Sequence, residues 1–170
     1  KYAGDNNLYF DPDAIPLNHE SEYVPCPEGS LGVIYKPKIV RSPSKPWAYA
    51  HPDFFVQTGE PDKYDLSGIE VKTVSEGMYR KYWADNTIPP WQYYQVVWYS
   101  IVTGIDHWKL VGLAPHLRLS TDPILVHDLY IDADTKSTVM TKVHLFWSDL
   151  QNNTVPHIDK PSEADLKLLY

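Results

Sequence analysis

Two carboxylates and a lysine in the middle of the chain have the types and the spacing needed for metal-assisted hydrolysis. Asp53 follows a proline, and Glu70 and Lys72 stand in the later run Ile-Glu-Val-Lys-Thr. Residues two apart on a strand project to the same face, so Glu70 and Lys72 would lie side by side. Two carboxylates at the ends of adjacent strands can share a divalent ion, and the lysine could orient or help deprotonate an attacking water. The alternative that the same spacing allows is a surface strand face of salt bridges.

Sequence context separates these three residues from similar patterns elsewhere. Pro-Asp also occurs at 12–13 and 61–62, and an acid-x-lysine pattern recurs at 134–136 and 165–167. Only Glu70 and Lys72 alternate with apolar residues in a strand-like run, and only Asp53 lies in a matching upstream strand. We therefore predict that these three residues form one site.

Gln95 and Tyr99 stand one helical turn apart in an otherwise apolar stretch, so they would share a face of a helix. A glutamine there could donate a hydrogen bond to the water or a phosphate oxygen, or bond to the lysine. The tyrosine hydroxyl could hold a neighbouring group. A core glutamine bonded only to the backbone is the alternative.

The elements that must position these residues follow from periodicity and from turn residues. Strands are predicted over 32–36, 38–40, 47–57, 68–74, 108–113 and 124–131, with a loop over 58–67. Helices are predicted between Pro89-Pro90 and Gly104, from an Asp134 cap through a stripe of Val139, Val143, Phe146, Trp147 and Leu150, and in short pieces over 18–23 and 162–169. This order predicts an α/β or α+β layered protein, with residues 1–170 in a single domain and an irregular segment over 1–30.

Several of these runs together resemble a known family. The resemblance covers about residues 47–170 and rests, in order, on Pro52-Asp53, Ile69–Thr73, Ile88–Gln95, Val102-Thr103-Gly104, Phe146-Trp147, Val155-Pro156 and Asp159. The chain resembles the YqaJ-like viral recombinase family, which groups with lambda exonuclease in the PD-(D/E)XK nuclease superfamily. The Gln-x-x-x-Tyr element at 95–99 is similar to one found in RecB-type members.

The resemblance implies a restriction-endonuclease-like α/β core, a central mixed sheet flanked by helices. It implies that Asp53, Glu70 and the carbonyl of Val71 hold Mg²⁺ or Mn²⁺, that Lys72 is the catalytic lysine, and that Gln95 and Tyr99 are site residues. The family also carries an upstream acidic ligand, for which Glu20 and Glu22 are the candidates.

The function expected from the residues and the resemblance is that of a magnesium-dependent deoxyribonuclease. It would act as an exonuclease at double-stranded DNA ends in phage-type recombination, in the cytoplasm of a host cell. The resemblance also implies a ring-shaped homo-oligomer and a single-strand annealing protein as partner. A structure-specific or restriction-type endonuclease is one alternative. The other is a non-catalytic nucleic-acid-binding module, whose 6 Trp and 13 Tyr would stack on bases.

Composition limits the remaining classes of function. The net charge of −7 gives no bulk attraction to nucleic acid, although a local groove can still be positive. Cys26 is the single cysteine and the seven histidines lack zinc-site spacing, so neither a disulfide framework nor a zinc site is expected. No apolar run is long enough to span a membrane. The chain begins with Lys, so further residues are expected before Lys1, and further residues are also expected after Tyr170.

Overall fold

The computed structural model describes residues 8–11, 31–37, 39–60, 63–117 and 123–154. The internal contacts of the chain divide it into two compact units, Lys1–Lys136 and Ser137–Tyr170, which are treated separately below. The predicted helices over 18–23 and 162–169 lie outside the described residues, as do Glu20 and Glu22.

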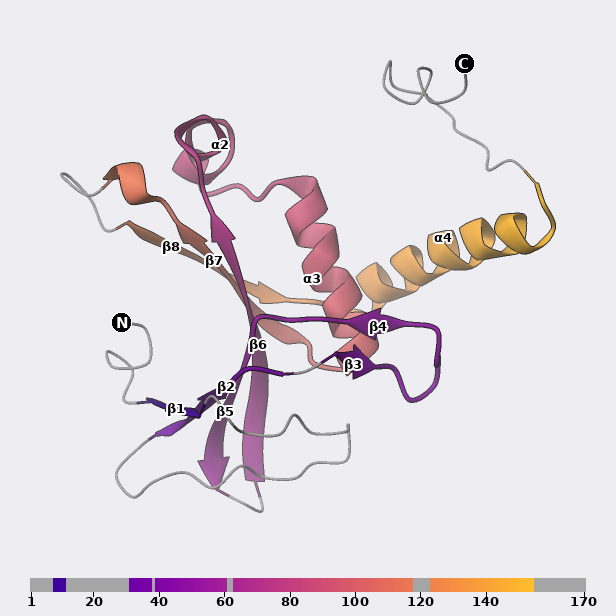
Figure 1. Cartoon of the computed structure of the whole chain (residues 1–170), viewed down its shortest axis with the longest axis horizontal. Helices are drawn as coiled ribbons and strands as arrows, with labels where there is room; N and C mark the ends of the chain where they lie inside the picture. Colours follow the sequence, from indigo (N-terminus) through magenta and orange to yellow (C-terminus); the bar gives the residue numbers. More distant parts are fainter. Residues whose placement is uncertain (1–7, 12–30, 38, 61–62, 118–122, 155–170) are drawn as a thin grey trace. The chain divides into compact units, whose positions relative to one another are not determined.

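The first unit is built on a six-stranded mixed sheet with the strand order β1-β2-β5-β6-β7-β8 (Figure 1). The strands are β1 (Leu8–Asp11), β2 (Gly32–Tyr35), β5 (Phe54–Glu60), β6 (Lys63–Thr73), β7 (His107–Leu113) and β8 (Ile124–Tyr130). The pairs β1–β2 and β6–β7 are parallel and the other three are antiparallel. A separate two-stranded hairpin pairs β3 (Val40–Arg41) with β4 (Tyr49–Ala50).

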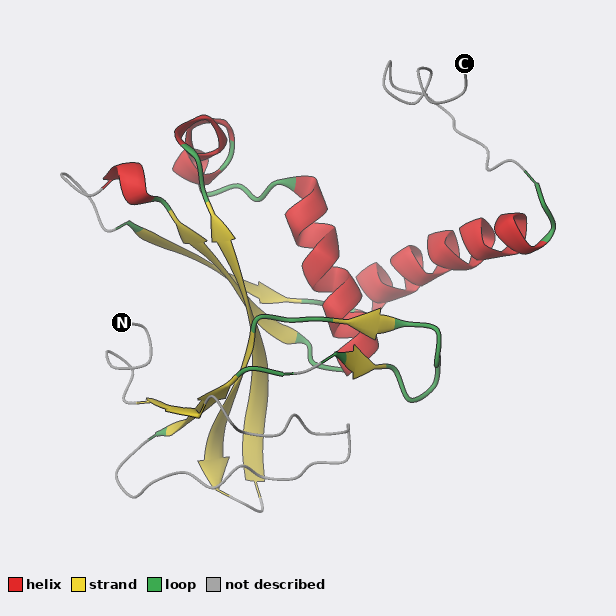
Figure 2. Ribbon diagram, in the orientation of Figure 1, coloured by secondary structure: helices red, strands yellow, loops and turns green. Residues whose placement is uncertain are grey.

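Helical segments accompany this sheet (Figure 2). They are α2 (Glu76–Lys81), the 3₁₀ turn η1 (Trp83–Asp85), α3 (Pro90–Thr103) and the 3₁₀ turn η2 (Pro115–Leu117). The parallel β6–β7 pair needs a crossover connection, and α2, η1 and α3 supply it. The predicted α/β class, with a mixed sheet flanked by helices, is therefore confirmed.

Aromatic side chains fill the space between the sheet and α3. The ring of Trp108 on β7 lies 5.6 Å from that of Tyr99 on α3 and 6.2 Å from that of Phe55 on β5. Gly68 pairs with Trp108 across the strands, and a Cβ at Gly68 would stand 2.2 Å from the indole ring. A side chain at position 68 would therefore displace Trp108, which is fully buried. The other face of the sheet carries a smaller cluster of Ile34, Val56 and Ile69.

Helix α3 has the bounds that its flanking residues predict. It begins at Pro90, where a missing N–H costs nothing, and Gly104 ends it in the left-handed conformation with φ 75°. The Gly104 N–H donates to the Ser100 carbonyl at 2.9 Å. The helix buries Val96, Val97 and Val102.

The prediction of one strand over 47–57 is wrong, because the structure has two strands there that are interrupted between Ala50 and Phe54. Pro52, which has no N–H, is fully buried in that break, and a proline cannot donate to a central ladder. The predicted loop over 58–67 is also wrong. There β5 and β6 pair as far as Glu60 and Lys63.

Helix α2 follows β6, was not predicted, and is capped by the side chain of Ser75. Three further corrections concern local signals. The segment expected to be irregular contains β1. The strand predicted over 38–40 is limited to Val40–Arg41. Helix α4 (Ala133–Gln151) is capped by Asp132 and not by Asp134: the Asp132 carboxylate accepts from the Thr135 N–H at 2.7 Å.

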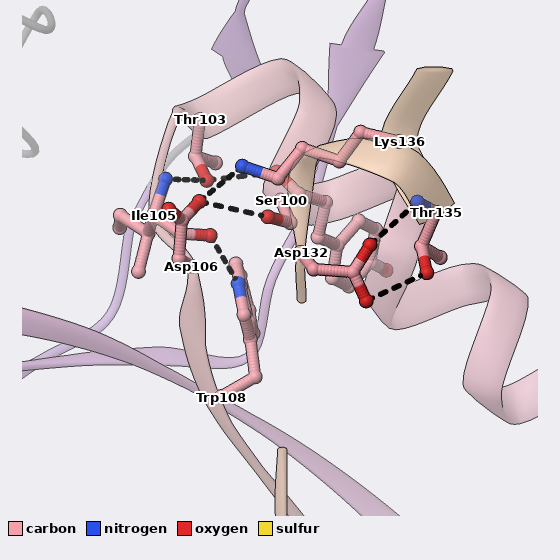
Figure 3. A network of polar contacts seen from close by, with 9 residues as sticks. Ser100, Thr103, Ile105, Asp106, Trp108, Asp132, Thr135 and Lys136 are labelled. Carbon is pink, nitrogen blue, oxygen red and sulfur yellow. Dashed lines mark hydrogen bonds and ion pairs between the residues drawn. The ribbon is translucent and has the colours of Figure 1, made fainter. Parts of the chain in front are cut away.

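A polar network within the first unit surrounds Asp106 (Figure 3). Asp106 forms an ion pair with Lys136 and accepts a hydrogen bond from Ser100 at 3.5 Å. Within the second unit, the part of α4 from Ser137 onward buries no side chain, and Leu145, Phe146, Trp147 and Leu150 are exposed. None of the described helices is long and apolar enough to cross a membrane.

Candidate active site

Asp53 reaches the edge of β6 where the β5 ladder begins. Phe54 is the first residue of β5 and pairs with Ile69, so the antiparallel direction places Asp53 level with Glu70. No β5 residue is left to pair with Val71, and the Asp53 side chain takes that place. Its Oδ2 accepts a hydrogen bond from the Val71 N–H at 2.8 Å. A residue remote in sequence is thereby fixed beside the Glu-Val-Lys run.

Glu70 and Lys72 share one face of β6, and α3 provides the next layer. Lys72 Nζ and Glu70 Oε1 form an ion pair. Gln95 Nε2 donates to the same Glu70 Oε1 at 2.9 Å and lies 2.7 Å from Tyr99 Oη. The Tyr99 hydroxyl is 3.3 Å from the carbonyl oxygen of His51, two residues before Asp53. The structure therefore brings all five predicted side chains into one connected set.

Burial makes the charge on Glu70 unfavourable. The residue is only 3% exposed, and its Oε2 has no hydrogen-bond partner among the described residues. Loss of hydration raises the pKa of the Glu70 carboxyl above its ordinary value, and the neighbouring Asp53 charge raises it further, while the hydrogen bond from Lys72 acts in the opposite direction. A buried carboxylate with one free oxygen is stabilised by any cation that reaches it.

Burial also raises the pKa of Tyr99, although the hydrogen bond with Gln95 partly opposes that shift. Tyr99 therefore stays a neutral hydroxyl over the working pH range of an enzyme. It acts as a hydrogen-bonding link between α3 and the His51 backbone.

The oxygen atoms available at this site are suitable ligands for a hard divalent cation. Glu70 Oε2 is available, Asp53 supplies a second carboxylate, and the N–H and C=O of an extended residue point to the same side, so the Val71 carbonyl faces the side of Asp53. Mg²⁺ takes oxygen ligands and is commonly held by one or two carboxylates together with substrate phosphates. Within the described residues no group of three or more His, Cys, Asp and Glu side chains gathers, so a third acidic ligand from this part of the chain is not observed.

Its position beside Pro52-Asp53 makes His51 the histidine expected to approach the site, and the structure assigns a contact there to its backbone carbonyl, which was not predicted. The signal was the buried Pro52, which forces the chain out of the ladder and turns the backbone toward α3. The roles of the five side chains stay predictions, because their placement together does not measure an activity.

The fold of this chain is similar to that of known protein structures. The chain is similar to the alkaline exonuclease LHK-Exo from Laribacter hongkongensis, with a TM-score of 0.59 and 18% identity over 72% of this chain and 59% of that one. A complex of LHK-Exo with dAMP matches with a TM-score of 0.60 and 19% identity over 72% and 58% of the two chains. No protein-family model and no curated protein matches the sequence. The chain spans less than two thirds of the length of LHK-Exo, and over 72% of its own length it shares the fold of that protein.

Proposed function

We propose that the protein is a metal-dependent DNA exonuclease that hydrolyses phosphodiester bonds at double-stranded ends. The observation that carries this proposal is the buried Glu70 carboxylate, whose Oε1 is held by Lys72 and Gln95 and whose Oε2 is buried without a hydrogen-bond partner among the described residues. The name of LHK-Exo supports exonuclease activity, and its dAMP complex contains a deoxynucleoside monophosphate, the product expected from cutting DNA one nucleotide at a time.

The residues divide the chemical work. Mg²⁺ bound by Asp53, Glu70 and the Val71 carbonyl would polarise the scissile phosphate and lower the pKa of the attacking water. Lys72 Nζ is a donor fixed by Glu70, so it can hold a water or a phosphate oxygen in line with the bond to be broken. Gln95 bridges Glu70 and Tyr99, so it positions the carboxylate and prevents its rotation.

The direct test uses linear duplex DNA labelled at the 5′ or the 3′ end, with Mg²⁺ or with EDTA. We expect stepwise release of nucleotides with Mg²⁺ only. We expect the variants Asp53→Asn, Glu70→Gln and Lys72→Met to remain folded and to show no cleavage. The end that loses its label first gives the polarity. Full activity in any of the three variants contradicts the site assignment.

Closed circular duplex of the same sequence separates the proposal from its nearest alternative. An exonuclease leaves the circle intact, whereas a structure-specific or restriction-type endonuclease cuts it. Binding without Mg²⁺-dependent cleavage of either substrate would identify a non-catalytic binding module.

Assembly and partners follow the same proposal. A chain with net charge −7 gains little from counterion release, so a single copy should leave DNA between cuts. A homo-oligomeric ring would keep the duplex enclosed, and a single-strand annealing protein would take the strand that remains. Light scattering gives the mass, and a DNA trap added after the first cut measures processivity. A monomer that digests past the trap contradicts the ring. Cytoplasmic location stays a prediction.

A further inference from the structure

A basic hairpin precedes Asp53 in this acidic chain. Residues 39–50, defined here as the basic hairpin, contain Arg41 and Lys45 and no Asp or Glu, although the whole chain has a net charge of −7. Arg41 is exposed on β3, opposite Tyr49 on β4. The chain then runs directly through His51 and Pro52 to the carboxylate site. Basic side chains therefore precede the acidic site closely along the chain, which favours the approach of a polyanionic strand.

Trp98 holds the basic hairpin against α3. Its Nε1 donates to the Tyr49 carbonyl at 3.0 Å, and its ring lies 6.2 Å from that of Trp47, with an angle of 32° between the planes. Figure 1 shows β3 and β4 lying beside α3. Trp98 is three positions after Gln95, so the two side chains are neighbours on the helix surface.

Other aromatic side chains extend this contact along α3. Trp91 is 57% exposed, Tyr94 is 54% exposed and Trp47 is 40% exposed, and α3 carries no charged residue. We call Trp47, Trp91, Tyr94 and Trp98 the aromatic strip. Trp91 and Trp98 are seven positions apart on one helix face, which is about 10 Å, or roughly three nucleotides at about 3.4 Å each.

A cation also stands near the end of the strip away from the hairpin. The Trp91 ring contacts that of Tyr82 at 5.6 Å, and Lys81 Nζ lies 5.2 Å from the centre of the Tyr82 ring. The strip thus has basic side chains at both ends. Aromatic platforms combined with basic side chains are the features with which proteins hold single-stranded nucleic acid.

We propose that the basic hairpin and the aromatic strip bind an unpaired DNA end of about three nucleotides beside the carboxylate site. The unpaired bases stack on the exposed rings, and Arg41 and Lys45 contact the phosphates. Duplex bases are already stacked on one another, so the strip discriminates in favour of frayed or tailed ends. The inference rests on the proposed function, because it takes DNA as the polymer that reaches Glu70.

The test measures binding without cleavage, by anisotropy of fluorescein-labelled duplexes in EDTA. The duplexes are blunt, or carry a five-nucleotide 5′ or 3′ tail, or carry the same tails with abasic sugars. We expect one tail polarity to bind about fivefold tighter than the blunt duplex, with that gain lost in the abasic version. A series of tail lengths should stop gaining affinity near three nucleotides.

Variants divide the two kinds of contact. Trp91→Ala and Tyr94→Ala should remove the gain from bases and leave abasic binding unchanged. Arg41→Ala and Lys45→Ala should weaken both tails alike and lower the salt slope by about one. Trp98→Phe keeps a ring and loses the hydrogen bond to Tyr49, so it tests the strip without emptying the contact. Tyr130→Ala, on β8 and 74% exposed, is the matched control and should change nothing.

Equal affinity for base-bearing and abasic tails contradicts the proposal that the aromatic strip binds the bases. A loss of affinity in Tyr130→Ala as large as that in Trp91→Ala contradicts it too. These outcomes are separate from failure of the proposed function. If the protein binds tails through the aromatic strip and does not cleave DNA with Mg²⁺, the binding inference stands and the nuclease proposal is contradicted.

Discussion

Two carboxylate–lysine pairs on the same sheet have opposite electrostatics. In the first pair, Glu70 and Lys72 lie under α3, and burial raises the pKa of the Glu70 carboxyl. In the second, Asp128 on β8 is half exposed and accepts from Lys109 Nζ at 2.7 Å. His107 Nε2 lies 2.5 Å from the other Asp128 oxygen. The hydrogen bonds from Lys109 and His107 hold the pKa of Asp128 below its ordinary value.

The difference shows which pair is built to receive a ligand. Both oxygens of Asp128 have partners, so a cation would have to displace an existing bond. Glu70 keeps a buried oxygen for which the described part of the chain offers no hydrogen-bond partner, and an unpaired oxygen of this kind costs stability in the metal-free protein. Buried groups with strongly perturbed pKa values and a specific charged neighbour are candidates for function, whereas satisfied surface pairs contribute little.

Cleavage should separate the two pairs most strongly. Glu70→Gln keeps the shape and removes a metal-holding charge, so we expect turnover to fall by about a thousandfold or more. Asp128→Asn should stay within about twofold of the wild type. Initial rates on end-labelled duplex measure both. A comparable loss in the two variants would remove the distinction drawn here.

Gln95→Ala tests whether α3 positions the buried carboxylate. We expect kcat to fall by roughly ten- to a hundredfold while KM changes little, because Gln95 contacts Glu70 and not a distant part of the DNA. Gln95→Glu places a second acid beside Glu70 and should be at least as impaired. If KM rises and kcat is unchanged, Gln95 is a DNA contact.

Metal binding should stabilise the wild type through the first pair only. A ligand present at a hundred times its Kd adds about 2.7 kcal/mol to the free energy of unfolding, a shift of a few degrees in Tm. We expect Mg²⁺ to raise the Tm of the wild type and of Asp128→Asn, and to leave that of Glu70→Gln nearly unchanged. Thermal denaturation with and without Mg²⁺ measures this, and an equal shift in all three proteins points to a metal site elsewhere.

The pH dependence of metal-free stability should have opposite signs at the two pairs. The folded pKa of Glu70 is raised, so its contribution is favourable below the ordinary carboxyl value of 4.5 and is lost as pH rises through the folded pKa. Glu70→Gln should therefore gain stability relative to the wild type on going from pH 4 to pH 7.

Asp128 should give the smallest effect. Its folded pKa is lowered, so its contribution is present above the ordinary value of 3.8 and disappears as pH falls below it. Asp128→Asn should cost less than about 1 kcal/mol at pH 7, because the pair is half exposed, and nothing in acid. Urea denaturation in EDTA at several pH values measures both variants. Parallel curves for Glu70→Gln and the wild type would contradict the sign.

Local periodicity accounts for the parts of the site that lie within one element. The two-residue period of a strand puts Glu70 and Lys72 on one face, and the helical turn puts Gln95 and Tyr99 together. Pro90 and Gly104 fix the ends of α3. The split of the expected strand over 47–57 was missed because the strand was continued through Pro52, although a proline without an N–H cannot lie inside a central ladder.

The sequence by itself determined the residue types, their spacing, the faces on which they lie and the resemblance to exonucleases. Tertiary structure alone decided that Asp53 accepts from Val71, that Gln95 donates to Glu70 and that Trp98 anchors the hairpin, contacts between residues 18, 25 and 49 positions apart. It also decided that one Glu70 oxygen is buried and has no hydrogen-bond partner within the residues that the structure describes. The physical reason is that the face on which a side chain lies depends on the φ and ψ angles of its own helix or strand. Its burial and its distance from a hydrogen-bond partner depend on which remote segments pack together.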